Sequence, residues 1–172
     1  MKTKFLLVAI SILLFTACQE QKSRYTQSSP EIETVKSLID DYNTKNYVAL
    51  VAKYADTAKT SFNLSKMASS EIPKYHEAND VNYSSRSFLE DGQEYEMVID
   101  DEGKTWVNFW GTWKGTLAGN GKEMMIPVHL TARFIDGKVV EDYGYWDTSE
   151  VVLALQEIEA NKVKELEEVP AD

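Results

Sequence analysis

The sequence has little of several features that define common classes of protein. Its 172 residues include one cysteine, so it can form neither an internal disulfide framework nor a cysteine-rich zinc site. Lys and Arg number 18 against 28 Asp and Glu, and the formal net charge of −10 excludes most nucleic-acid binding, which needs a basic face. The chain is 43% hydrophobic and 27% charged, which is typical of one soluble globular domain.

The N-terminal apolar run is too short to cross a membrane. A basic start at residues 1–4 precedes an apolar run from Phe5 to Phe15, whereas a spanning helix needs about 20 apolar residues. A basic start, a short apolar middle and small residues at the end are typical of a secretory signal peptide. We therefore expect residues 1–17 to be a signal peptide.

The end of this segment resembles the bacterial lipobox, in which small residues precede an obligatory cysteine. It reads Leu14-Phe15-Thr16-Ala17-Cys18. The resemblance implies cleavage before Cys18 and lipidation of this residue. The alternative is an ordinary signal peptide followed by a chance cysteine. The position of the only cysteine at the cleavage point favours the lipoprotein, because a lone thiol is a liability in an oxidising compartment.

These features predict a lipid-anchored protein of the bacterial cell envelope. Residues 18–29 are expected to be the lipidated cysteine and a polar tether. Gln19 stands where enteric bacteria use aspartate to retain lipoproteins at the inner membrane, so the outer membrane is favoured over the inner membrane. The acidic domain is expected to stand off from anionic headgroups, with the lipid alone holding it to the membrane.

Helical patterns open and close the region 30–160, which we expect to be one domain. Ser29 and Pro30 are typical of a helix start, and apolar residues then recur at helical spacing up to Tyr42. A second short helix is expected at 47–54, residues 65–79 are ambiguous, and a capping box predicts a last helix from Asp147. Residues 161–172 are expected to form a fraying charged tail.

The remaining patterns predict strands. One strand covers Ala58 to Phe62, and five more follow at 81–89, 94–99, 104–117, 122–135 and 138–146. Short joints with glycine separate the last five, as tight hairpins require. We therefore expect an antiparallel sheet in which sequence neighbours pair. The helices are too few to cover both faces, so the sheet is expected to curve around them.

Two stretches of the domain resemble the nuclear transport factor 2-like superfamily. The first combines Leu38–Tyr42 with Ala49–Asp56, and the second, Ala132–Asp147, resembles the SnoaL-like branch of polyketide cyclases. The resemblance covers about residues 30–155. It implies a cone-shaped α+β fold, with N-terminal helices packed on a strongly curved antiparallel sheet around an apolar pocket, and a homodimer formed through the sheet. The superfamily includes both enzymes and non-catalytic binders, so the fold alone does not decide the function.

Three positions bear on whether the resemblance extends to isomerase chemistry. Ketosteroid isomerase uses a carboxylate base together with a tyrosine and a protonated aspartate that bind the oxyanion. When Tyr54–Asp56 is aligned with the isomerase motif, Phe62 falls at the base, Leu38 at the tyrosine and Leu130 at the acid. Apolar side chains replace all three functions, so we assign no catalytic residue.

The aromatic strand is the other source of candidates. Trp106, Asn108 and Trp110 share one face of it, and Phe109 and Trp113 share the other. Large rings beside Asn108 predict either a ligand pocket or a core with a dimer interface. The candidate pocket residues are Leu38, Phe62, Trp106, Asn108, Trp110 and Leu130.

The two histidines are not expected to form a functional site. His129 is placed on the outer face of its strand and His76 in solvent, and their separation makes a metal site unexpected. We expect no cofactor. The predicted function is binding of a small apolar ligand, or of a protein partner, by an envelope lipoprotein. The alternative is a cyclase, isomerase or dehydratase acting on a small hydrophobic substrate in the cone.

Overall fold

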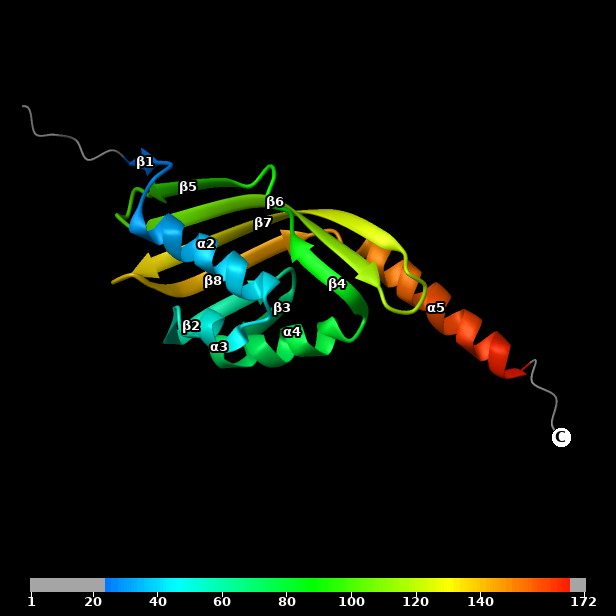
Figure 1. Cartoon of the computed structure of the whole chain (residues 1–172). Coiled ribbons are helices and arrows are strands. Elements are labelled where there is room, and N and C mark those ends of the chain that lie inside the picture. The colour runs from blue at the N-terminus through cyan, green and yellow to red at the C-terminus, as the bar shows by residue number, and fades with distance from the viewer. Residues whose placement is uncertain (1–23, 168–172) are drawn as a thin grey trace, which may run out of the picture.

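The computed structural model describes residues 24–167 (Figure 1). The predicted signal peptide, Cys18 and residues 19–23 of the predicted tether lie outside these residues. Helices α2 (Pro30–Asn43), α3 (Tyr47–Val51) and α4 (Ile72–Asp80) pack on one face of a curved sheet. This is the cone-shaped α+β arrangement that the sequence predicts. Within the described part of the chain, none of the helices is long and apolar enough to cross a membrane.

The sheet has eight strands in the described residues, in the order β1-β5-β6-β7-β8-β2-β3, with β4 paired to β6 off this path. Their bounds are β1 Tyr25–Thr26, β2 Tyr54–Phe62, β3 Ser65–Ala68, β4 Tyr83–Phe88, β5 Glu94–Ile99, β6 Thr105–Leu117, β7 Glu123–Ile135 and β8 Lys138–Trp146. The five strands predicted from residue 81 onward all form. Strand β1 is part of the sheet, although residues 18–29 were expected to be a tether.

Two pairings differ from the simple meander predicted. Strands β4 and β5 are neighbours in sequence, but both pair with β6, which is long enough to hold β5 along its first half and β4 along its second. Strand β2 lies parallel to β8, so the sheet is mixed. Because β2 follows two helices and no hairpin joins it to β8, turn geometry does not impose an antiparallel direction.

The ambiguous segment at 65–79 contains β3, a 3₁₀ turn at Ser69–Glu71 and α4. The last helix, α5, covers Ser149–Glu167 and projects from the body of the molecule (Figure 1). It continues beyond Asn161, where a fraying tail was expected. Good helix formers, and ion pairs such as Lys162 with Glu159 three residues before it, support a helix here without tertiary contacts.

A buried arginine holds the helices to the sheet. Arg86 lies on β4, is 7% exposed, and donates from Nε to Asp80 Oδ1 of α4 at 2.7 Å. Its guanidinium also donates to the Tyr42 carbonyl at the end of α2 and to the Tyr47 hydroxyl of α3. The guanidinium carbon lies 3.8 Å from the centroid of the Tyr42 ring. One side chain therefore connects β4 to all three helices.

Candidate functional site

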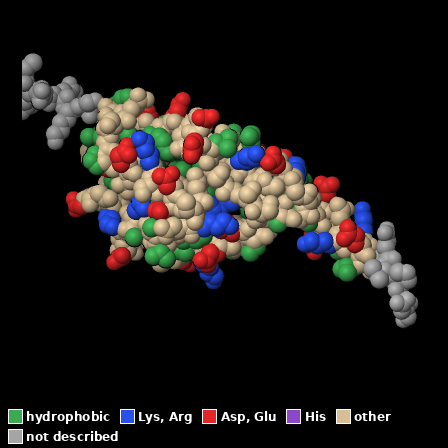
Figure 2. Space-filling view, viewed as in Figure 1, with side chains coloured by type: hydrophobic (Ala, Val, Ile, Leu, Met, Phe, Trp, Pro, Cys, Tyr) green, Lys and Arg blue, Asp and Glu red, His purple; other side chains and the backbone are tan. Residues whose placement is uncertain are grey.

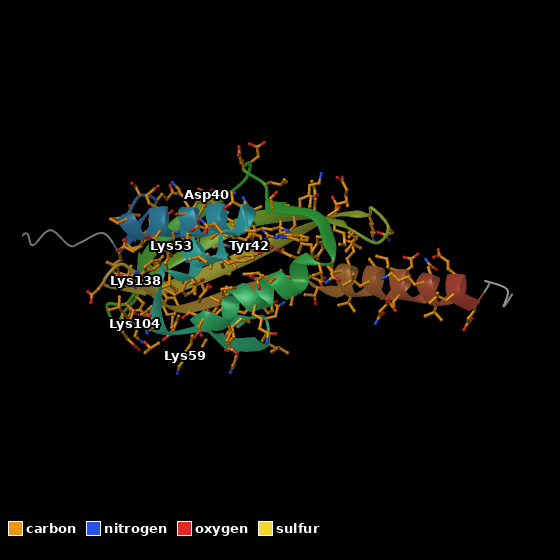
Figure 3. All side chains as sticks on the ribbon, turned by 60° about the horizontal axis from the view of Figure 1, so that its bottom comes forward. Asp40, Tyr42, Lys53, Lys59, Lys104 and Lys138 are labelled. Atoms are coloured by element: carbon orange, nitrogen blue, oxygen red, sulfur yellow. The ribbon has the colours of Figure 1, made fainter. Side chains whose placement is uncertain are left out.

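A cavity of about 210 Å³ lies between the helices and the concave face of the sheet. Its walls come from α2, α3, α4 and the inward positions of the long strands, and they are mainly aliphatic and aromatic. An apolar cavity of about 150 Å³ is known to hold benzene, so this one is large enough for a somewhat larger ring compound. Tyr42, labelled in Figure 3, contributes its ring from the end of α2.

The cavity contains one buried carboxylate, that of Asp142 on β8. Asp142 is 6% exposed, and Tyr54 on β2 donates a hydrogen bond to its Oδ2 at 2.7 Å. Burial raises the pKa of Asp142 to about 6, and the hydrogen bond from Tyr54 opposes the rise. Among the described residues, no Lys or Arg forms an ion pair with Asp142, and Oδ1 accepts no hydrogen bond. Oδ1 is therefore available to a ligand.

A β-bulge turns Asp142 inward. Glu141 pairs with Arg133, but Val139 pairs with Phe134, which leaves Val140 as the extra residue. Val139 and Asp142 consequently both face the interior, although they are three residues apart. Strict alternation from Val139 places Asp142 outside, so the sequence pattern does not reveal its inward position. The signal in the sequence that could have found it is the two-residue spacing of Asp142, Gly144 and Trp146, which places all three on the same inward face.

His76 on α4 is the second polar group of the cavity wall. His76 was expected in solvent, but α4 folds over the open end of the sheet, and much of the His76 side chain is therefore buried. The rings of Tyr42, Tyr47, Phe62 and Tyr75 lie with their centroids 5.0 to 5.7 Å from that of His76. Burial, reinforced by the positive charge of Arg86, lowers the pKa of His76 to about 4. The imidazole is therefore neutral at physiological pH.

The structure divides the predicted pocket residues between two faces of the sheet. Leu38, Phe62 and Leu130 line the cavity. Trp106, Asn108 and Trp110 lie on the outer face of β6 and do not line it. Alternation along β6 requires this, because the inward positions are taken by Val107, Phe109 and Trp113.

Each of the three outer residues has a partner outside the cavity. The indole of Trp106 donates to Asp100 Oδ2 at 3.0 Å, and the amide of Asn108 donates to Glu96 Oε1 at 3.1 Å. Trp110 stacks on His129 of β7 with ring centroids 4.9 Å apart. The tryptophans that do line the cavity are Trp113 and Trp146, and the indole of Trp113 donates to the Tyr42 hydroxyl at 2.8 Å.

The described residues contain no cluster of three or more His, Cys, Asp or Glu side chains that could hold a metal ion. His76 and His129 lie on opposite sides of the sheet, one at the cavity and one on the outer face. The polar groups of the cavity are thus suited to hydrogen bonding and proton transfer.

Solved structures share this architecture, whereas no family model and no curated protein matches the sequence. A candidate polyketide cyclase from Xanthomonas campestris pv. campestris superposes with a TM-score of 0.62 at 14% identity, covering 74% of this chain and 98% of that one. A nuclear transport factor 2-like protein of unknown function from Burkholderia pseudomallei gives 0.60 at 15% identity, covering 73% and 96%.

A third structure is that of a protein with a ketosteroid isomerase-like fold from Catenulispora acidiphila, in complex with trimethylamine. It gives a TM-score of 0.57 at 14% identity, covering 68% of this chain and 87% of that one. At these identities the comparisons show the fold. The chain has the nuclear transport factor 2-like fold that is shared by polyketide cyclases and isomerases.

The raised pKa of Asp142 predicts how stability depends on pH. The folded state holds this proton more tightly than the unfolded chain, whose Asp has a pKa of 3.8. Asp142 therefore favours folding at low pH, and this contribution is lost as the pH rises from about 4 through about 6. Relative to wild type, Asp142→Asn should gain roughly 2 kcal/mol of unfolding free energy between pH 4 and pH 7.5.

Urea unfolding at several pH values measures this difference. The lowered pKa of His76 has the opposite effect in the same range, but it is present in both proteins and cancels in the comparison. Asp136→Asn is the matched control, because Asp136 lies exposed in the β7–β8 hairpin. A difference between Asp142→Asn and wild type that does not change with pH would contradict the assignment.

Proposed function

We propose that this protein is an envelope-anchored lipoprotein that binds a small, largely apolar molecule with one polar group inside the cone. The observation that carries the proposal is the cavity, which joins apolar walls to one free carboxylate oxygen on Asp142. Ligand sites commonly have this composition, with a few polar groups that fix orientation. The trimethylamine complex of the Catenulispora protein supports it, because that protein of similar fold binds a small molecule.

The energetic cost of Asp142 also supports a role in binding. An ionised carboxylate without a cationic partner destabilises the folded state, so Asp142 contributes poorly to stability at neutral pH. Groups with pKa values shifted by burial inside a cavity are enriched at functional sites. Functional sites commonly reduce the stability of the folded protein in this way, and a bound ligand can restore it.

A substitution that fills the cavity tests ligand binding. Ala132 faces inward beside Asp142 on the neighbouring strand, and Thr131 points to the opposite face. Ala132→Met should lower the affinity for benzyl alcohol or 2-phenylethanol by about tenfold or more, because its side chain occupies the ligand's volume. Thr131→Met should bind as wild type does.

The fluorescence of the full-length protein, purified in detergent, provides the measurement, since Trp113 and Trp146 line the cavity. The proposal fails if neither these alcohols nor charged analogues with the same ring bind to wild type. It fails also if both methionine variants bind as well as wild type does.

The anchor is supported by the sequence and by the position of the first strand. Tyr25 and Thr26 pair with β5, so the chain between Cys18 and the sheet can span at most about 25 Å. The domain would then stand off from the headgroups by no more than this distance. Several acyl chains on Cys18 suffice for stable anchoring without electrostatic attraction to lipids.

Substitution of the lipidation site tests the anchor. Cys18→Ser should move the protein from the membrane fraction to the soluble fraction of the envelope, because no acyl chain can be attached. In an enteric host, Gln19→Asp should retain lipidation and move the protein from the outer to the inner membrane. Membrane localisation that survives Cys18→Ser would contradict the lipid anchor.

The outer face of the sheet supports a homodimer. Trp110 and Tyr145 are 38% and 51% exposed, and both stack with His129 between them. Exposed aromatic clusters of this kind are frequent at protein interfaces. Trp110→Ala should weaken dimerisation by about tenfold or more, as measured by sedimentation equilibrium. Val48→Ala, an exposed site on α3, is the control, and a monomeric wild type would refute the dimer.

A second candidate is an enzyme that transfers a proton to or from a small hydrophobic substrate. The observation that favours it is the Asp142 carboxyl, whose pKa of about 6 and hydrogen bond from Tyr54 suit a general base or acid. Deuterium exchange beside the carbonyl of a cyclic ketone, followed by NMR, distinguishes the two functions. Exchange that is abolished in Asp142→Asn would establish the enzyme, and no exchange above the solvent rate would leave the binding protein.

A further inference from the structure

The cavity wall carries a negatively charged group but no positively charged one. It includes the carboxylate of Asp142 but no Lys or Arg, and His76 is neutral. Arg86 lies against the Tyr42 ring of the wall, but its charge is paired with Asp80. Asp142 is therefore the one formally charged group that the described residues present to a ligand.

The two carboxylate oxygens of Asp142 differ in whether they already accept a hydrogen bond. Oδ2 already accepts the hydroxyl of Tyr54, and Oδ1 accepts nothing from residues 24–167. An ionised carboxylate has no hydrogen to donate, so the polar group of a ligand that meets Oδ1 must be a donor. The donors that form the strongest hydrogen bonds with a carboxylate carry a positive charge.

We propose that the ligand of this cavity is a small organic amine in its protonated form, with its ammonium group on Asp142 Oδ1 and its apolar part among the aromatic rings of the wall. This inference rests on the proposed ligand-binding function. The cation would supply the partner that the buried carboxylate lacks, and the rings of Phe62, Tyr75 and Trp146 would cover the hydrocarbon.

The surroundings favour a cation at longer range as well. The chain has a net charge of −10, which raises the local concentration of cations and lowers that of anions. Figure 2 shows acidic and basic side chains interspersed on the face it presents, with no continuous basic area. An anionic ligand would meet the Asp142 carboxylate with no basic side chain in the wall to compensate it.

Three ligands with the same ring and different charges test the proposal. Benzylamine is a cation at pH 7.5, benzyl alcohol is its neutral analogue, and benzoate is an anion. Each is titrated into the full-length protein in a maltoside detergent, which carries no charged headgroup. Benzylamine should bind about tenfold or more tightly than benzyl alcohol, and benzoate should bind least.

The pH dependence identifies the group responsible. As the pH falls from 7.5 to 5, Asp142 takes up a proton and the preference for benzylamine over benzyl alcohol should disappear. His76 stays neutral over this range, and the hydroxyls of Tyr42 and Tyr54 stay protonated because burial raises their pKa values. The other charged side chains near the wall, Arg86 and Asp80, remain paired.

Asp142→Asn separates the charge from the shape of the site. It should bring the affinity for benzylamine down to that for benzyl alcohol, while Asp136→Asn should keep the wild-type preference. If benzyl alcohol binds and benzylamine binds no better, the amine assignment is wrong and the ligand-binding function stands. If no ligand of the series binds, the amine assignment and the proposed function both fail.

Discussion

The ion pair between Arg86 and Asp80 is the interaction on which the arrangement of the helices depends. A guanidinium has several donors in a fixed plane, and here they reach a carboxylate on α4, a carbonyl on α2 and a hydroxyl on α3. A buried charge is costly unless all its donors are satisfied, so the three helices can take only positions that satisfy Arg86. The same charge lies against Tyr42 and helps to keep His76 neutral.

The cavity results from this arrangement together with the curvature of the sheet. Three helices cover the concave face without filling it, and aromatic rings from α2, α4 and the strands line the space that is left. Gly144 on β8 contributes to this fit, because a Cβ there would lie 2.9 Å from Phe62 and 3.0 Å from Leu130. Asp142 then places a carboxylate in a region where none of the described residues supplies a neutralising charge, and the proposed ligand chemistry follows from that imbalance.

The two faces of the sheet present different side chains because strands alternate. Along β7, Ile126, Val128 and Ala132 face the cavity, and His129 faces outward between Trp110 and Tyr145. The proposed ligand binding on the inner face and the proposed subunit pairing on the outer face can therefore use residues that are adjacent in sequence. Substitutions on one face should leave the other face intact, which makes the two roles separable by mutation.

Periodicity in the sequence predicts the long strands, the first helix and the inward position of Leu38, Phe62 and Leu130. It does so because periodicity reports which way a side chain points relative to its own backbone. Three features could be seen only in the folded structure: β2 lies parallel to β8, α4 brings His76 to the cavity, and Asp142 faces inward. These depend on contacts between segments far apart in the chain, and on a bulge that breaks the alternation on which the sequence pattern relies.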